Sequence, residues 1–535
     1  MTDSAILLRT HAGRELRLLP DPGRTLAQAI FLHRDEKGAG LWDGVPLCAG
    51  LGRCGLCRVR YLSPAPQAGA EELVRLGGEA VGQGWRLSCM HPAAPCEVEL
   101  PEPGRSAPPR RAPLTTVRPS TPLALAVDLG TTSIHWMALE RSLPLSKGQG
   151  LNPQMGLGSE IMARLAHAQK PGGADTLRGL VLDRLRALAA EAAALHGQPV
   201  ARLCVAGNSA MTYLLLGLDA GSIARAPYRL DYAGGDEREL APDLPPALIP
   251  PLLAPFVGGD LSAGMAALHF SPAGPPDYPF LLADLGTNGE FVLALSPTEH
   301  LLASVPMGPA LEGVGLRHGR TAGPGAVRAY ALTPAGLAPQ FVEHGPKSGS
   351  ASARNAGITG VGYLSLAAAL LRAGALDETG RFVVPATPLG RKLMAGLTQS
   401  GGETALPLPG GMALPASDVE ELVKVKAAFN LALSRLLAES GLAPGALKSV
   451  HLAGAMGEHV DAGDLAALGF LPEVLAGRLV RAGNTSLQGA RLLLTRPDAW
   501  DWVLALPDNC RALNLAADSG FGAQYVERMV LRHVS

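Results

Sequence analysis

Hydrophobic and polar positions alternate with a period of two near the start of the chain, which predicts a β-hairpin. Its expected strands are Ala5–Thr10 and Glu15–Leu19, and Thr25–Leu32 is predicted to form a short helix. Together these elements predict a small β-grasp domain, residues 1–100. Residues 101–122 are dense in Pro and Arg and have no apolar periodicity, so we expect an extended linker there.

A second pattern occurs twice further along the chain. Leu123–Leu139 and Phe280–Leu295 each contain an apolar strand, an Asp-Leu-Gly-Thr turn and a second strand. Repetition on this scale indicates duplication, and we expect two lobes at residues 123–277 and 278–535. Another apolar strand, followed by a turn of small residues, lies at 449–457.

Composition limits the class of protein. A chain of 535 residues has room for three or four domains, and its net charge of -1 gives no field that would favour nucleic acid or an anionic membrane. Met1–Leu19 carries early charges and lacks the apolar core of a signal peptide, and no run of 18 apolar residues occurs. We therefore expect a soluble, cytoplasmic protein that binds neither nucleic acid nor membrane.

Four cysteines near the N-terminus have the spacing of a [2Fe-2S] site. Cys48, Cys54 and Cys57 lie in a glycine-rich loop, and Cys89 follows after residues 58–88. Plant-type ferredoxins have gaps of four and two residues before a distant Cys, and the first gap here, residues 49–53, is one residue longer. Glycines let backbone N–H groups approach the cluster sulfurs. The loop therefore predicts a cluster.

Other interpretations of the cysteines are a zinc site or redox-sensing thiols. Structural zinc usually has paired two-residue spacings, and only one such pair is present here. Gly50–Gly55 also matches a dinucleotide fingerprint, but it lacks the strand-to-helix context of that motif. Cys96, Cys204 and Cys510 lie outside the pattern, and we expect buried or idle thiols there.

The repeated turns have the chemistry of a phosphate site. Glycine lets backbone amides approach phosphate, Thr and Asn side chains donate hydrogen bonds, and Asp holds Mg²⁺ directly or through water. Two such turns, facing each other, would hold nucleotide phosphates from both sides. A flat adenine could lie against the small residues at 449–457, although a strand that leads into a helix cap gives the same letters. No P-loop and no common hydrolase signature occur.

The two turns and the late small-residue segment resemble the phosphate 1, phosphate 2 and adenosine motifs of the acetate and sugar kinase, heat-shock chaperone and actin superfamily. From Cys48 onward the chain resembles the reductive activators of corrinoid proteins. The supporting segments are Asn152–Gln154, Gly207–Met211, Pro255–Asp260, Gly308–Gly313 and Ala482–Ser486. The resemblance implies a multi-domain fold: an α+β, β-grasp ferredoxin-like domain followed by a duplicated α/β ribonuclease-H-like, actin-type ATPase core.

The activity implied by this resemblance is ATP-dependent repair of a corrinoid protein. A low-potential donor would pass an electron through the [2Fe-2S] cluster to return Co(II) to Co(I), with ATP or ADP and Mg²⁺ bound to the core. An alternative is a nucleotide-gated redox sensor or scaffold that reduces no cobalt. A third, a sugar or acid kinase fused to a ferredoxin, has no acceptor-site signature. Whether the chain forms a homodimer is left open.

Residue roles follow from the same resemblance. The cluster ligands would be Cys48, Cys54, Cys57 and Cys89. Phosphate and Mg²⁺ would be held by Asp128, Gly130, Thr131 and Thr132 on one lobe, and by Asp284, Gly286, Thr287 and Asn288 on the other. The adenosine pocket would be lined by Gly454, Ala455 and Gly457. Glu312 is a further candidate contact, and Glu290 would orient the attacking water, unless it is a surface carboxylate of its strand.

Three segments depart from the pattern of the activators. Glu160 stands where an Asp is expected, a longer carboxylate at any metal or switch position. Val305–Met307 replaces small residues, and residues 353–358 lack an expected Cys-Gly-Ser-Gly sequence. These changes bear on nucleotide affinity and on the choice of partner.

Overall fold

A computed structural model describes residues 5–35, 40–48, 50–102, 110–342, 357–400, 403–454, 457, 459–515, 518 and 520–535. The chain divides into two compact units. The first consists of Met1–Pro108, Met155–Ser159 and Glu312–Leu422, and the second consists of Pro109–Gln154, Glu160–Leu311 and Val423–Ser535. In the described ranges no helix is long and apolar enough to cross a membrane.

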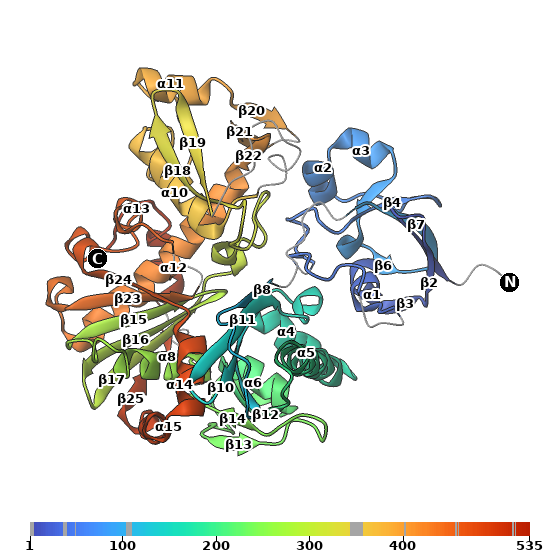
Figure 1. The fold of residues 1–535 in the computed structure, drawn as a ribbon. Helices are drawn as coiled ribbons and strands as arrows, with labels where there is room; N and C mark the ends of the chain where they lie inside the picture. Colours follow the sequence, from blue (N-terminus) through green and yellow to red (C-terminus); the bar gives the residue numbers. More distant parts are fainter. Residues whose placement is uncertain are drawn as a thin grey trace. The chain divides into compact units, whose positions relative to one another are not determined.

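The N-terminal part of the first unit is built on a mixed five-stranded sheet with the order β2-β1-β7-β4-β5 (Figure 1). Its strands are β1 (Ile6–Thr10), β2 (Glu15–Leu18), β4 (Arg58–Tyr61), β5 (Trp85–Leu87) and β7 (Cys96–Leu100). β1 pairs antiparallel with β2 and parallel with β7. The predicted hairpin is confirmed, and the last strand ends at Leu100, as expected of a β-grasp domain.

Helix α1 (Leu26–Leu32) covers one face of this sheet. It begins after Thr25, whose hydroxyl accepts from the Gln28 N–H while the Gln28 side chain accepts from the Thr25 N–H. This capping box satisfies two N–H groups that the helix leaves unpaired, so the predicted helix is confirmed. Leu26 and Ile30 pack with Leu8 and other strand residues in a core that also contains Cys57 and Cys89. The remaining short elements are β3 (Asp21–Thr25), α2 (Ala70–Leu76), α3 (Gly78–Gly82), η1 (Ser88–Met90) and β6 (Pro92–Ala93).

The rest of the first unit contains hairpins and a buried helix. Its elements are η2 (Met155–Leu157), β18 (Val327–Thr333), β19 (Gly336–Phe341), α10 (Gly360–Arg372), α11 (Pro388–Met394), β20 (Thr398–Ser400), β21 (Glu403–Leu408) and β22 (Met412–Pro415). Helix α12 (Ala416–Ser440) continues from here into the second unit.

The second unit repeats one sheet arrangement, which agrees with the predicted duplication. In the first sheet, β9 (Leu123–Leu129) lies between antiparallel β10 (Ser133–Glu140) and parallel β12 (Val200–Gly207). In the second sheet, β15 (Phe280–Leu285) lies between antiparallel β16 (Asn288–Ser296) and parallel β23 (Ser449–Gly454). The outer strands are β11 (Leu143–Leu151), β13 (Asp236–Arg238) and β14 (Ala247–Ile249) in the first sheet, and β17 (Glu299–Pro306), β24 (Leu479–Gly483) and β25 (Cys510–Ala512) in the second.

Part of the predicted linker is an edge strand. β8 (Arg110–Pro113) pairs antiparallel with β11. An edge strand needs neither an apolar face on both sides nor N–H donors along its whole length, so Pro and Arg are tolerated and the sequence carries no alternation.

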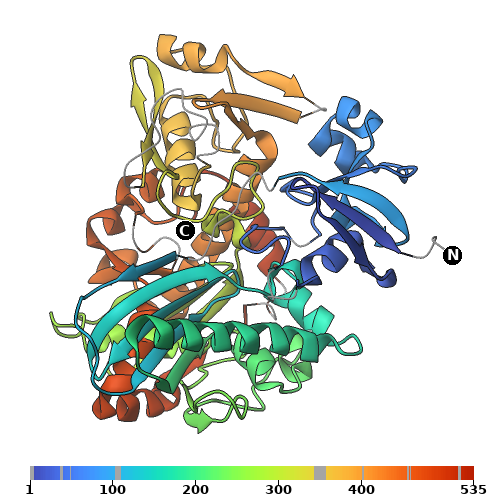
Figure 2. The same cartoon turned by 45° about the vertical axis from the view of Figure 1, so that its right-hand side comes forward.

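Two helices lie between the sheets of the second unit (Figure 1). α8 (Gly259–His269) and α14 (Thr485–Thr495) share one core cluster with the first sheet, in which Ala263 and Ala490 meet Ala126. The other face of α8 packs on the second sheet, where Leu261 meets Leu282. α5 (Gly173–His196) forms a long helix against the first sheet, near α4 (Ile161–Ala168) and α6 (Ser209–Leu216) (Figure 2). The other short elements are α7 (Gly221–Ala224), η3 (Pro309–Glu312), η4 (Pro444–Ala446), α13 (Ala462–Ala467), η5 (Glu473–Arg478), α15 (Pro497–Leu504), η6 (Pro507–Asn509) and α16 (Phe521–Glu527).

The contact between α8 and α14 makes a first prediction. A Cβ added at Gly489 would lie 1.9 Å from the carbonyl oxygen of Ala263, so the helices could not keep their present spacing. We expect Gly489→Ala to destabilise the chain by about 3 kcal/mol, the upper range for an overpacked core. Gly179→Ala on α5 is the matched control, because an added Cβ there meets nothing within 4 Å. Thermal unfolding of both variants measures the effect, and a Gly489→Ala variant as stable as Gly179→Ala would contradict it.

Candidate functional site

The two Asp-Leu-Gly-Thr turns of the second unit meet at their tips. The hydroxyl oxygens of Thr132 and Thr287 lie 2.7 Å apart in a hydrogen bond. Both side chains are buried. Asp128 and Asp284 occupy matching places near the ends of β9 and β15, so the duplicated strands bring duplicated carboxylates to one place in the unit. The sequence predicted facing hairpins, and the structure brings the two turns together.

Three side chains from outside the first turn hold its backbone and hydroxyl. The amide of Asn152 donates to the Gly130 carbonyl at 2.8 Å. The amide of Asn208 donates to the Thr131 hydroxyl at 3.0 Å. The fully buried guanidinium of Arg164 donates to the Thr131 carbonyl. These contacts use two carbonyl oxygens and one hydroxyl of the turn and none of its backbone N–H groups, which are the groups that bind an anion in such a turn.

Asp128 lies at the N-terminus of α14. Its two carboxylate oxygens accept from the Asn484 amide at 2.6 Å and from the Ser486 hydroxyl at 3.0 Å. Asn484 is also the N-cap of the helix, since its side-chain oxygen accepts from the Leu487 N–H at 2.7 Å. The helix N-terminus favours a nearby negative charge. One residue therefore caps α14 and orients the carboxylate.

The second turn lies against the end of β23. Asp284 pairs in register with Ala453, and a Cβ on Gly454 would lie 2.3 Å from an Asp284 carboxylate oxygen. Gly454 also has a φ of +70°, so only glycine fits here without strain. The Gly457 N–H donates to the Gly454 carbonyl at 3.0 Å. Ala455 lies outside the described residues.

Two backbone hydrogen bonds hold the second turn. The Gly286 N–H donates to the Asn288 carbonyl at 3.0 Å, and the Thr287 carbonyl accepts from the Met307 N–H at 3.1 Å. Met307, which stands where a small residue was expected, is buried and packs against Gly289. The departure therefore fills space behind the turn.

Glu290 is buried rather than exposed, so the surface interpretation is wrong. Its side chain is 5% exposed on β16, and its Oε1 has no hydrogen-bond partner among the described residues. Burial, together with the nearby charges of Asp260 and Asp284, raises the pKa of Glu290 well above its usual value. A neutral carboxyl is thus favoured until a cation or a proton acceptor approaches.

Asp260 is a second buried carboxyl of this group. It stands in the first turn of α8 beside Glu290, and its Oδ1 accepts from the Leu261 N–H at 2.9 Å. Burial, followed by repulsion from Asp128, raises the pKa of Asp260 to about 7. Burial and repulsion among the carboxyls thus favour the neutral form of both groups. In the described part of the chain, no three His, Cys, Asp or Glu side chains are gathered closely enough to hold one metal ion.

Three further sites were singled out in the sequence: Glu312, Glu160 and residues 353–358. Glu312 ends η3 and belongs to the first unit, and its role stays a prediction. Glu160 is the exposed N-cap residue of α4 and makes no side-chain cap hydrogen bond. The departure at 353–358 lies mostly outside the described residues, because only 357 and 358 are described.

The four cysteines of the first unit form two buried pairs. Cys48 lies beside Cys54, and Cys57 lies beside Cys89, so that each thiol shifts the pKa of a neighbour. All four are at most 7% exposed. Each iron of a [2Fe-2S] cluster is bound by two cysteine thiolates. Two pairs of cysteines therefore match the number and the kind of ligands that the cluster requires.

Backbone groups in the loop face these sulfurs. The Leu56 N–H donates to the Cys54 sulfur at 3.4 Å, and the N–H groups of Leu51 and Arg53 donate to the Cys48 sulfur. Hydrogen bonds, the first from the Cys54 thiol, lower the pKa of Cys48 to about 6. Three loop glycines in the left-handed region allow this inward turn, with φ of +102°, +67° and +70° at Gly50, Gly52 and Gly55. The loop fits a thiolate-bound cluster.

The other cysteines lie away from this loop. Burial raises the pKa of Cys96 to about 11, that of Cys510 to about 12, and that of Cys204 further. Cys204 is buried, and Cys96 and Cys510 are partly buried. This agrees with the expected buried or idle thiols.

Two models of one protein family match this chain. Residues 123–272 match the model of the RACo middle region, and residues 279–535 match the model of the C-terminal domain of RACo, the ASKHA domain. The two regions follow one another along the chain without overlap, and together they cover residues 123–535 except 273–278. The chain belongs to the RACo family.

Relatives of this RACo-family chain agree with that assignment. It is 26% identical over 429 residues to the corrinoid activation enzyme RamQ of Eubacterium limosum. This match covers 75% of the present chain and 69% of RamQ. It is 29% identical over 303 residues to the [Co(II) methylated amine-specific corrinoid protein] reductase of Methanosarcina barkeri, about half of each chain (52% and 50%). The fold matches that of the solved reductive activator for corrinoid, iron-sulfur protein, with a TM-score of 0.69 and 21% identity over 100% of this chain and 99% of that one.

Some residues of the RACo-family core have no signal in the sequence. Arg164 lies in an ordinary amphipathic helix, and its contact with the first turn depends on tertiary packing. Asp260, Asn484 and Ser486 fall in segments that the resemblance marked, but nothing in the letters assigned them a contact. A polar residue at a predicted helix start, as in Asn484, is the one signal that could have been used.

Proposed function

We propose that the chain is an ATP-dependent reductive activator that returns the Co(II) of a corrinoid protein to Co(I). The observation that carries this proposal is that one chain has both a cysteine site and a phosphate-type site. The cysteine cradle consists of two pairs, Cys48 with Cys54 and Cys57 with Cys89. The phosphate-type site consists of the two Asp-Leu-Gly-Thr turns, which meet at Thr132 and Thr287. The names of the relatives support cobalt as the target. The partner is then a corrinoid protein, and the electron comes from a low-potential donor.

The cysteine loop would hold the cluster, and the second unit would hold the nucleotide. Cys48 with Cys54, and Cys57 with Cys89, would each bind one iron; when bound, the cluster supplies one-electron transfer at low potential. In the core, the N–H groups of the two turns would face the phosphates of ATP or ADP. Asp128 and Asp284 would hold Mg²⁺ directly or through water.

The buried carboxyls give the core a means to respond to the nucleotide. Asp260 and Glu290 favour protonation when buried beside other carboxyls, and a divalent cation would reverse that preference. Glu290 would then accept a proton from, or orient, the attacking water. A ligand shifts a protein equilibrium only through its different affinity for two states, so ATP would drive cobalt reduction by favouring one state of the complex.

A cobalt-reduction assay tests the proposal. The anaerobically reconstituted chain is mixed with a corrinoid methyl carrier produced by the same organism, and Co(II) and Co(I) are followed by absorbance. We expect Co(I) only when a reductant and Mg·ATP are both present, and none with ADP. If ATP binds and no co-expressed corrinoid protein is reduced, the chain is a nucleotide-gated sensor instead. Phosphorylation of a sugar or an acid would indicate a kinase.

A further inference from the structure

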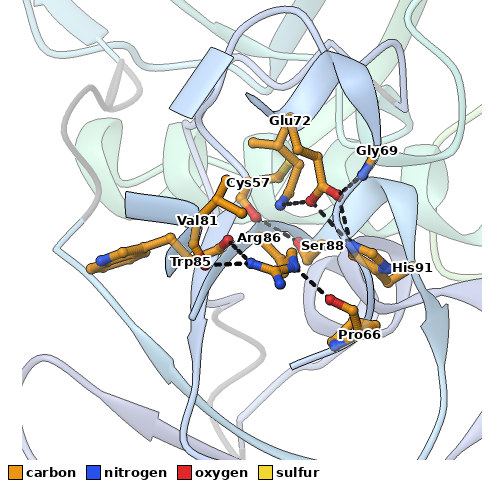
Figure 3. A network of polar contacts seen from close by, with 10 residues as sticks. Cys57, Pro66, Gly69, Glu72, Val81, Trp85, Arg86, Ser88 and His91 are labelled. Atoms are coloured by element: carbon orange, nitrogen blue, oxygen red, sulfur yellow. Dashed lines mark hydrogen bonds and ion pairs between the residues drawn. The ribbon is translucent and has the colours of Figure 1, made fainter. Parts of the chain in front are cut away.

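Glu72 is a fully buried carboxylate in a network of polar contacts that includes Cys57 and Ser88, the residue before Cys89 (Figure 3). It lies on α2, and its side chain is 0% exposed. A buried carboxylate is unfavourable unless hydrogen bonds compensate the loss of water. Its partners therefore indicate what it holds in place.

Three N–H groups meet at this carboxylate. Oε2 accepts from the Gly69 N–H at 2.9 Å, and Oε1 accepts from the Leu87 N–H at 2.7 Å. The ring nitrogen Nε2 of His91 lies 3.0 Å and 3.1 Å from the two oxygens. One partner comes from the start of α2, and the other two come from the segment that carries Cys89.

These two contacts bracket Cys89 in the sequence. Leu87 comes two residues before it and His91 two residues after it, so one carboxylate fixes both ends of η1. Between them, Ser88 donates to the Cys57 carbonyl through its hydroxyl at 2.6 Å and through its N–H at 3.1 Å. The network thus joins the Cys57 carbonyl to Ser88 and His91, which lie on either side of Cys89 in the sequence (Figure 3).

Other contacts hold the same segment from the opposite side. The His91 carbonyl accepts from the Leu26 N–H, the first of α1, at 2.8 Å. The buried Arg86 guanidinium donates to the carbonyls of Pro66, Val81 and Trp85. Because the neighbouring backbone is held by these contacts, we expect a substitution at Glu72 to change the position of Cys89.

We propose that Glu72 is a positioning residue for the Cys57–Cys89 half of the cluster site. This inference rests on the proposed [2Fe-2S] site, and it assigns Glu72 no contact with the cluster. Groups that orient metal ligands typically change metal affinity by 10- to 100-fold when they are replaced. The Cys48–Cys54 half lies in the glycine loop, so Glu72 acts on one half of the site.

The test compares Glu72→Gln with Glu71→Gln. Gln keeps the size of the side chain but replaces one acceptor oxygen by an NH₂ donor, so the three N–H groups cannot all be satisfied. Glu71 is the neighbouring exposed residue of α2 and serves as the control. After anaerobic reconstitution, we expect Glu72→Gln to lose iron to a chelator roughly tenfold faster than the wild type, with shifted g-values in the EPR spectrum of the reduced cluster. Glu71→Gln should match the wild type in both.

Thermal unfolding of the same samples separates positioning from stability. Faster iron loss with an altered spectrum, at an unchanged unfolding temperature, supports the role of Glu72. If Glu72→Gln does not fold, His91→Ala decides, because it removes one of the three donors and should give a smaller increase in the same rate. A wild-type rate and spectrum in the deciding variant would overturn the role of Glu72 and leave the proposed function standing. A wild-type chain that takes up no [2Fe-2S] cluster would overturn both.

Discussion

Replacing Cys54 with serine is expected to abolish both the EPR signal of the reduced [2Fe-2S] cluster and ATP-dependent cobalt reduction. Cys54 pairs with Cys48 and receives the Leu56 N–H at its sulfur, so it sits at the centre of one half of the cradle. Serine supplies a hard, protonated oxygen where iron–sulfur clusters need a soft thiolate. We expect at least a 100-fold loss of cobalt reduction, measured by absorbance, with nucleotide binding by the second unit unchanged.

Cys96→Ser is the matched control for this variant. Cys96 belongs to the same domain and begins β7, but it is outside the cradle, and burial keeps its thiol protonated. It should keep the full EPR signal and full cobalt reduction. An intact [2Fe-2S] signal in Cys54→Ser would remove this residue from the ligand set. Loss of ATP binding in the same variant would show that the substitution damages more than the cluster site.

Much of the fold could be predicted because its signals are local. The N-terminal hairpin alternates regularly, Thr25 and Gln28 mark a helix start, and the two Asp-Leu-Gly-Thr turns stand in matching strand contexts. Each signal needs only a few neighbouring residues. Strand β8 was missed because it has no such local signal. It lies at the edge of a sheet, where a strand needs no alternation, and its partner β11 is distant in the sequence.

The contacts within the candidate site depend on tertiary structure. Thr132 and Thr287 were both predicted, but their hydrogen bond arises only when two sheets pack on the helices between them. Asp128 is oriented by Asn484 and Ser486, which follow far later in the chain. Whether Glu290 was buried or exposed could not be decided from alternation, because consecutive residues of β16 are buried and both of its faces are therefore covered.

The cysteine site shows the same division. The spacing of Cys48, Cys54 and Cys57 identified a cluster loop without any structure. The pairing of Cys57 with Cys89 depends on how β4 and β5 meet, and contacts from helix α2, for which no role was predicted, stabilise it. A carboxylate such as Glu72 looks in sequence like any polar residue of a short helix.

Asp260→Asn is expected to make the chain more stable at pH 8 and weaker in binding Mg·ATP. The pKa of Asp260 is about 7 in the folded chain, above the ordinary value of about 3.9 for an unfolded Asp. Between these two values the folded state holds the extra proton, so stability falls as pH rises, and above about pH 7 the loss is complete. The whole shift corresponds to about 4 kcal/mol, an upper limit for the gain from a neutral Asn at pH 8.

The pH profile separates this explanation from a general improvement in packing. At pH 4 Asp260 is largely neutral in the folded chain and its charge matters little, so wild type and Asp260→Asn should unfold at nearly the same temperature; calorimetry should show them diverging from pH 4 to 7. Asp501→Asn, an exposed acid of α15, should show no such divergence. Isothermal titration should give a 10- to 100-fold weaker Mg·ATP affinity for Asp260→Asn. A constant stability difference across the pH range would mean that the charge of Asp260 is not its cause. Weaker binding is expected because a carboxylate that lowers stability is kept where function requires its charge. An unchanged affinity for Mg·ATP would place Asp260 outside the nucleotide site.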